Sequence, residues 1–128
     1  MAAANVSVIF TRPAPHTFET AKTVDNALTI LDKAGVKVAV TTLDMSFTRN
    51  IRWEAGFAVS EGLDYYTGLK AITKNPAQML GIYASGAGSI QIGNKANFVL
   101  YSSDPLAIGG QVQLVALGSF AQCNPVPL

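Results

Sequence analysis

Two short β-rich runs separated by a helical segment are the feature that most constrains how this chain can fold. The first run, NVSVIFT at residues 5–11, is rich in β-branched and aromatic residues and ends before Pro13, which has no N–H to donate to a sheet. The second run, VKVAVTT at residues 36–42, starts directly after Gly35. Apolar residues recur at helical spacing over residues 24–34. This order predicts a buried pair of parallel strands joined by a crossover helix.

Helix start and stop signals follow the second run. Residues 51–60 are small and apolar enough for a close-packed helix, and a glycine ends it before Asp64 can cap a second helix. Asn75 stands directly before a proline, so we expect it to cap a third, short helix that ends at Gly81. The first part of the chain is therefore predicted to be α/β throughout.

After Gly81 the sequence changes to short strand-like runs between glycines. These runs are residues 89–92, 97–101 and 112–117. Their spacing predicts antiparallel β-structure. We therefore divide the chain into an α/β segment at 1–80, a β-rich segment at 81–122 and a tail at 123–128, in which we place Cys123.

Charge, cysteine content and hydropathy narrow the classes of partner and location. Nine Lys and Arg stand against eight Asp and Glu, a net charge of +1 without clusters, so we expect neither a nucleic-acid nor a membrane partner. No run approaches the roughly 20 apolar residues that a membrane span needs. The single cysteine, Cys123, excludes an internal disulfide, which favours a cytoplasmic location.

The loops after the two strands hold the polar residues best placed for chemistry, because parallel α/β sheets bind ligands beyond the carboxyl ends of their strands. The first loop carries Arg12, His16 and Thr17, and the second carries Asp44, Ser46, Arg49, Asn50 and Arg52. Asp44 could bind a cation or act as a general base, or it could cap the loop or pair with Arg49. Arg12 and Arg49 could clamp an anionic group or form surface salt bridges, and His16 could equally be a loop hydrogen-bonding residue.

A complete catalytic constellation is absent from the sequence. The chain has one histidine, and it has no HxH, HExxH, CxxC, GxSxG or P-loop motif. A histidine-based metal site would therefore need ligands from another segment or another chain.

Two motifs in the second half resemble the end of amidohydrolase-superfamily chains. KAITKNPAQMLG at 70–81 is similar to the family's T-x-N-P-A-x-x-L-G helix. GSIQIGNKANFV at 88–99 is similar to its G-S-I-x-x-G-K-x-A-D-x-V return into a small β-sandwich, with Asn94 and Asn97 departing from the pattern. An aspartate-proline pair at 104–105 also resembles the family's next motif.

The resemblance implies that the chain corresponds to the last two βα units of a TIM-type (β/α)₈ barrel followed by β-sandwich strands, an incomplete barrel because a whole one takes roughly 250 residues. It also implies that Asp44 is the metal ligand and proton-handling residue of a metal-dependent hydrolase of non-peptide C–N bonds. Arg12, His16, Arg49 and Asn50 become candidate substrate-binding residues. The loops at Arg12 and Arg49 are further similar to fungal sugar-deacetylase-like members.

The family's histidine ligands are missing from this sequence. The resemblance therefore implies that a divalent metal, most often zinc, and a small-molecule substrate would bind in a full-length parent and not in this chain alone. The chain alone is expected to hold no cofactor and to be inactive. The alternative is a non-catalytic interaction or scaffold module, or a pseudoenzyme, whose apolar surface is covered in an oligomer or by a complementing chain. A third alternative is a metal-free hydrolase with Asp44 as its base.

Overall fold

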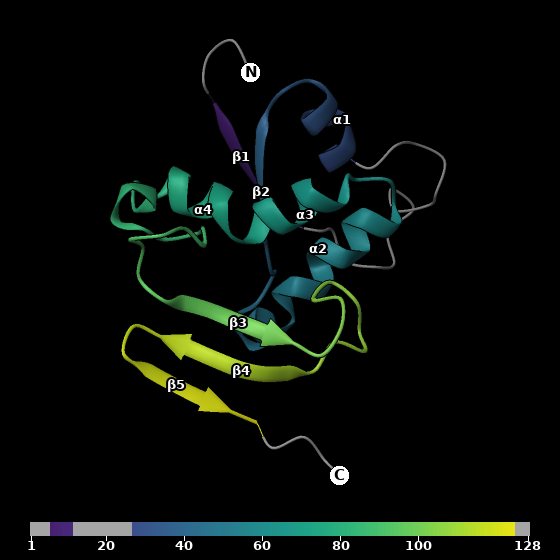
Figure 1. The fold of residues 1–128 in the computed structure, drawn as a ribbon. Helices are drawn as coiled ribbons and strands as arrows, with labels where there is room; N and C mark the ends of the chain where they lie inside the picture. Colours follow the sequence, from purple (N-terminus) through teal and green to yellow (C-terminus); the bar gives the residue numbers. More distant parts are fainter. Residues whose placement is uncertain (1–5, 12–26, 125–128) are drawn as a thin grey trace.

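A computed structural model describes residues 6–11 and 27–124, which form two small β-sheets with helices packed between them (Figure 1). In the first sheet β1 (Ser7–Thr11) pairs in parallel with β2 (Lys37–Thr41), and Ser7 lies opposite Lys37. The predicted parallel pair is therefore confirmed. Helix α1 (Ala27–Lys33) leads into β2 through Gly35, whose φ of 73° lies in the left-handed region that glycine adopts without strain. None of the helices described has the length and apolar character to cross a membrane.

The hydrophobic core lies between β2 and the helices α1, α2 (Ile51–Ser60) and α3 (Tyr65–Ile72). Its buried side chains are Leu28, Val38, Val40, Ala58, Leu63 and Ala71. Strand β1 was predicted to be buried, but this is wrong, because its side chains alternate between exposed and half-buried and Ile9 is 62% exposed. Within the residues described, β1 pairs with β2 on one edge and with no strand on the other. An outer strand of this kind is left open to solvent.

The helices begin and end close to their predicted positions, with one correction at α4 (Lys74–Met79). Asp64 caps α3 as predicted, since its carboxylate accepts a 2.9 Å hydrogen bond from the Thr67 amide. Asn75 does not cap α4, however, because the helix already includes it. Its side chain is buried instead and donates a 2.7 Å hydrogen bond to the Val38 carbonyl of β2. A buried strand carbonyl needs a donor, and Asn75 supplies it.

The second sheet is antiparallel, in the order β3 (Asn97–Tyr101), β4 (Val112–Leu117), β5 (Phe120–Cys123). The first two strands were predicted with these bounds. The last was not, and it includes Cys123, which was assigned to the tail but pairs opposite Leu114. The turn between β4 and β5 uses Gly118 at a φ of 62°. The predicted strand at 89–92 is wrong: these residues form turns and irregular backbone, and no described strand pairs with them.

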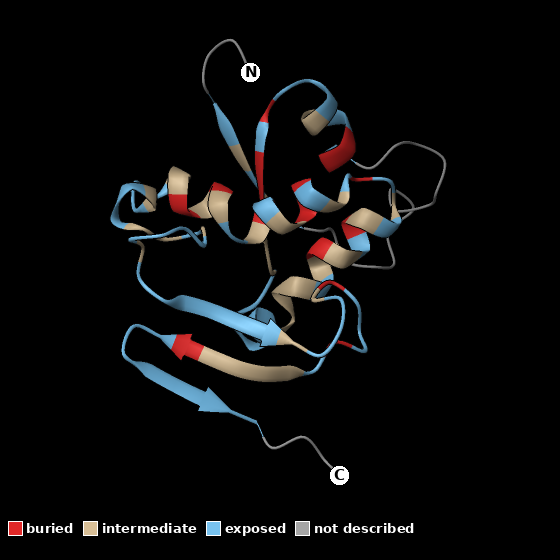
Figure 2. Ribbon diagram, viewed as in Figure 1, coloured by how far each residue is buried: buried red, intermediate tan, exposed pale blue. Residues whose placement is uncertain are grey.

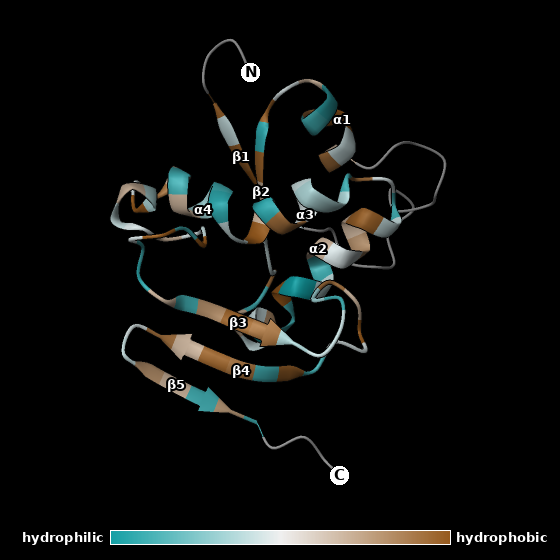
Figure 3. Cartoon of the chain, in the orientation of Figure 1, coloured by the Kyte–Doolittle hydropathy of each residue, from teal (hydrophilic) through white to brown (hydrophobic). Residues whose placement is uncertain are grey.

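Much of the second sheet is both apolar and exposed. Strands β3 and β4 are largely hydrophobic in Figure 3, whereas β3 and β5 are coloured as exposed in Figure 2. Ala116 is the buried residue of β4. Large exposed side chains on and before the sheet include Ile90, Ile92, Phe98, Leu100, Leu117 and Phe120.

The loop between β3 and β4 joins the two parts of the molecule by packing on α2 and α3. Leu106 in this loop is 6% exposed. A Cβ atom at Gly56 of α2 would overlap the Leu106 carbonyl oxygen, and one at Gly68 of α3 would lie 3.5 Å from Leu106 Cδ1. Helix α2 can approach the loop this closely because it carries glycine at the point of contact, whereas Gly68 allows α3 to pack closely on Val59 of α2.

We expect Gly56→Ala to destabilise the protein by about 1–3 kcal/mol, the usual cost of overpacking. This sign is opposite to helix propensity, which favours alanine over glycine by up to about 1 kcal/mol. The free energy of unfolding from urea denaturation measures the effect. Gly109→Ala is the matched control, because a Cβ there would meet no atom within 4 Å. Equal stability of the two variants would contradict the close contact at Leu106.

We expect Asn75→Ala to destabilise the protein by about 1–3 kcal/mol, because the Val38 carbonyl would stay buried without its donor. Thermal unfolding followed by circular dichroism checks this. Gln78→Ala, on the same helix, is the control for altered helix propensity. A loss no greater than that of the control would show that the Asn75 bond adds nothing to stability.

Candidate functional site

The candidate site lies at the carboxyl end of β2, where Asp44 follows the strand by three residues. Val38 and Val40 fix the strand in the core, so the point at which the chain leaves the sheet is well defined. The Thr42 hydroxyl donates a 3.1 Å hydrogen bond to the Asp44 carbonyl and tightens this exit. Asp44 itself is exposed. The predicted position of Asp44 beyond the edge of a parallel sheet is therefore confirmed by the fold.

Asp44 is the N-cap of the 3₁₀ helix η3 (Met45–Asn50). Its Oδ1 accepts a 2.7 Å hydrogen bond from the Ser46 backbone amide. The Ser46 backbone N–H, and after it the Ser46 side chain, lower the pKa of the Asp44 carboxyl below its ordinary value, because both bonds favour the ionised form. Of the roles left open for Asp44, the loop cap is the one seen in the structure, and it leaves an exposed carboxylate at the sheet edge.

The other candidate residues are placed unevenly. Arg49 and Asn50 form the last turn of η3, where Arg49 is exposed and Asn50 is half-buried. Asn50 is also the N-cap of α2, but its side chain makes no capping hydrogen bond there. Arg12 and His16 lie outside the residues described. The structure thus places Asp44 as the cap at the start of one short helix, and Arg49 and Asn50 at the end of that helix.

The residues described do not fit a metal centre by themselves. No group of three or more His, Cys, Asp and Glu side chains comes together within 6–11 and 27–124. A catalytic zinc site needs about three protein ligands. Asp44 offers one carboxylate, and its Oδ1 already accepts a hydrogen bond from the Ser46 amide.

Arg52 is a well-anchored polar residue near the site, which the sequence places among the polar residues of the second loop without a role of its own. It lies in the first turn of α2, and its guanidinium donates to three carbonyls of the loop between β3 and β4. The acceptors are Pro105 at 2.8 Å, Ala107 at 2.8 Å and Gly110 at 2.9 Å. The guanidinium also lies 5.3 Å from the centre of the Tyr101 ring of β3. No local signal could have revealed these bonds, because all the acceptors are backbone atoms more than 50 positions away.

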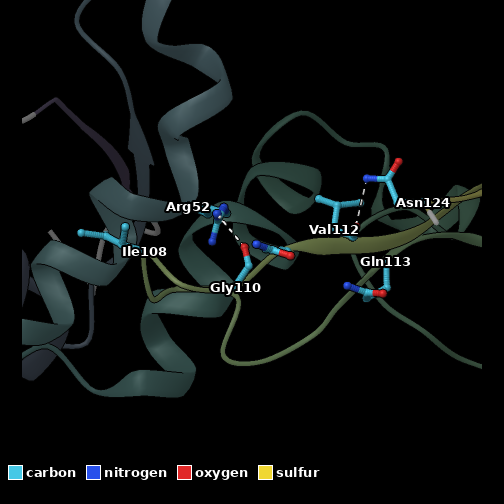
Figure 4. A pocket seen from close by; sticks show the side chains of 7 residues that line it. Arg52, Ile108, Gly110, Val112, Gln113 and Asn124 are labelled. Atoms are coloured by element: carbon cyan, nitrogen blue, oxygen red, sulfur yellow. Dashed lines mark hydrogen bonds between the residues drawn. The ribbon is translucent and has the colours of Figure 1, made fainter. Parts of the chain in front are cut away.

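An open cleft of about 500 Å³ lies beside this guanidinium (Figure 4). Its lining is formed by Arg52, Ile108, Gly110, Gln111, Val112, Gln113 and Asn124. The Asn124 side chain is itself engaged, because it donates a 3.1 Å hydrogen bond to the Val112 carbonyl. Two of the polar side chains that line the cleft, Arg52 and Asn124, therefore join parts of the chain to each other.

Asp104 makes a second connection between the two parts of the molecule. Its Oδ1 accepts hydrogen bonds from the Tyr65 hydroxyl at 2.8 Å and from the Leu106 amide at 2.9 Å. Donation to this carboxylate raises the pKa of the Tyr65 hydroxyl, with a smaller effect from desolvation. Tyr65 and Asp104 hold the loop on α3, and neither lies on η3.

Comparison with known proteins identifies the family. The profile of the Amidohydrolase family matches residues 37–115, from the start of β2 through most of β4, which is more than half of the chain. The chain belongs to this amidohydrolase family. The match includes Asp44, Arg52 and the loop that Arg52 binds, so the candidate site and the connection to the second sheet both lie in the part that the family shares.

A solved amidohydrolase from Thermotoga maritima has a similar fold. The two structures superpose with a TM-score of 0.75 at 24% identity, over 94% of this chain and 32% of the other. This amidohydrolase chain thus spans about a third of the length of the Thermotoga maritima chain. The likeness supports the fold described here for the shorter chain. No curated protein matches the chain.

The capping bond of Asp44 is expected to depend on pH. Because the pKa of the folded state is lowered, the bond contributes stability above the ordinary pKa of an aspartate and loses it as the pH falls through the lowered value. The amide proton shift of Ser46 in an NMR titration should follow this loss. In Asp44→Asn the side-chain oxygen accepts at every pH, so the same shift should stay flat through the acid range. A Ser46 shift that titrates equally in both proteins would contradict the capping bond.

Proposed function

We propose that this amidohydrolase chain supplies the carboxyl-terminal part of the catalytic fold of a metal-dependent hydrolase that cleaves non-peptide C–N bonds. The observation that carries the proposal is the exposed Asp44 carboxylate beyond the end of β2, inside the segment that matches the family. The parallel pair β1–β2 would be two neighbouring strands at the end of a (β/α)₈ barrel, and the edge of β1 that no described strand pairs with is where the preceding strand of the barrel would add.

The electrostatics of Asp44 favour one of its two predicted roles. A carboxyl with a lowered pKa is ionised at neutral pH, so it can bind a cation but accepts a proton poorly. We therefore propose that Asp44 acts first as an anionic ligand, together with groups from outside the residues described. The Ser46 amide bonds to Oδ1, so a proton would be taken up at Oδ2 and would weaken the bond that Oδ1 accepts.

The remaining substrate-site assignments rest on the sequence. Arg49 and Asn50 lie on the same short helix as Asp44, which supports a common substrate loop. Arg12 and His16 are proposed for the same loop cluster from their position after β1. The finer assignment to fungal sugar-deacetylase-like members depends on the same loops, and a cytoplasmic location depends on the single cysteine.

A second candidate function is a non-catalytic module. It is favoured by the apolar side chains that the second sheet exposes and by the lack of a metal-binding cluster in the part of the chain described. In that case another copy of the chain, or a complementing chain, would cover these side chains, and no hydrolysis would follow. The two candidates differ in whether Asp44 matters to activity.

A graft into the Thermotoga maritima amidohydrolase separates them. Its matching third is replaced by residues 6–124 of this chain, and hydrolysis of a panel of amides and cyclic amides is assayed. We expect an active graft that loses about 100-fold in kcat on Asp44→Asn, with unchanged circular dichroism. A smaller graft of residues 36–50 keeps the test valid if the larger one does not fold. Activity indifferent to Asp44→Asn in either graft would refute the proposal.

Metal content and mass of the unmodified chain form the complementary measurement. We expect far less than one metal ion per chain by mass spectrometry, and an oligomer by light scattering, because the described residues lack a ligand cluster and expose apolar side chains. About one transition metal per chain, lost in Asp44→Asn, would overturn the claim that the centre needs groups from elsewhere.

A further inference from the structure

The helix that carries the candidate site has little to hold it in place. None of the residues of η3 is buried, and Met45 and Phe47 are exposed hydrophobic side chains. The Thr48 hydroxyl donates back to the Met45 carbonyl, a bond within the same helix. The position of η3 is therefore set at its two ends, by β2 on one side and by α2 on the other.

The α2 end is fixed by Arg52, two residues after η3. Its guanidinium donates to three carbonyls of one loop, those of Pro105, Ala107 and Gly110, at 2.8–2.9 Å. A planar guanidinium with several donors in a fixed arrangement defines direction as well as distance, which a lysine ammonium cannot do. The first turn of α2 is thereby oriented against the loop between β3 and β4.

The loop between β3 and β4 is itself held in place by buried contacts. Leu106 is buried beside Gly56 of α2 and Gly68 of α3. The Asp104 carboxylate accepts a hydrogen bond from the Leu106 backbone amide. Gly110 is buried as well, and a Cβ there would lie 2.5 Å from the Asp104 carbonyl oxygen. Movement of the first turn of α2 relative to this loop would therefore require the three Arg52 bonds to break.

We propose that Arg52 is a positioning residue, which holds η3 and with it the Asp44 carboxylate by tying the first turn of α2 to the loop between β3 and β4. The second sheet, which carries none of the candidate site residues, thus sets the geometry of the site. The effect of this positioning on catalysis rests on the proposed function. The effect of Arg52 on the stability of η3 can be tested in the chain itself.

Hydrogen exchange at η3 is the test, because the Ser46 and Phe47 amides bond to Asp44 at 2.7 and 3.1 Å. In Arg52→Ala we expect these two amides to exchange about tenfold faster or more, while amides of β2 and α3 keep their protection. Arg52→Lys should restore only part of the protection, since one ammonium cannot replace the three-carbonyl arrangement. Arg52→Met, which keeps most of the aliphatic stem, replaces the alanine variant if that variant unfolds.

Two matched controls distinguish positioning from general loosening. Arg49→Ala removes an exposed cation from η3 itself, and Tyr65→Phe removes another hydrogen bond between α3 and the loop. Neither should change exchange at Ser46 and Phe47 by more than about twofold. Unchanged exchange in Arg52→Ala, or an equal increase over the whole chain, would overturn the proposal.

Activity of the graft then separates this proposal from the proposed function. Arg52→Ala should lower kcat more than it changes KM, because the carboxylate is displaced rather than removed. Faster exchange at η3 in a graft whose activity ignores Asp44 would uphold the positioning by Arg52 and refute the hydrolase proposal. Normal exchange at η3 in Arg52→Ala, together with activity that is lost on Asp44→Asn, would refute the positioning by Arg52 and support the hydrolase proposal.

Discussion

The arrangement of this chain depends on the contacts that the loop between β3 and β4 makes with the helices, through the carbonyls that Arg52 binds and through the buried Leu106. The core around β2 and the antiparallel sheet of β3 to β5 share no strand, so the loop between β3 and β4 and its contacts with α2 and α3 join them. An arginine suits this position because it remains charged and satisfies several carbonyls at once. Leu106 adds apolar burial to the same place.

The proposed positioning by Arg52 would give the second sheet a part in the site, although that sheet contributes no candidate site residue among the residues described. An exposed 3₁₀ helix directly after a strand has weak local stability, because short helices of this kind have poor hydrogen-bond geometry. Asp44 stands at the start of such a helix. Anchoring the following helix to a rigid loop reduces the motion of the carboxylate without placing further groups beside it, which leaves its outer side open to a ligand.

Local signals allowed much of the α/β part to be predicted from the sequence. The parallel pairing of β1 with β2 follows from two β-rich runs around a helical segment, and the cap at Asp64 from residue type. Two of the errors concern pairing with partners distant in sequence. Asn75 looks like a cap but bonds to a carbonyl of β2, and residues 89–92 have the composition of a strand without a described strand beside them.

In the candidate site too, local sequence signals predict the position of the residues but not their hydrogen-bond partners. Its location after β2 could be predicted, because parallel sheets place functional loops at one edge. The capping role of Asp44 remained one of several alternatives until the Ser46 bond was seen, and the bonds of Arg52 had no signal at all, since their acceptors are backbone carbonyls. Backbone recognition leaves no residue pattern in the sequence. A positively charged residue directly after a candidate substrate loop therefore requires an account of its acceptors before it is assigned to substrate binding, and in this chain the acceptors of Arg52 are backbone carbonyls of the protein itself.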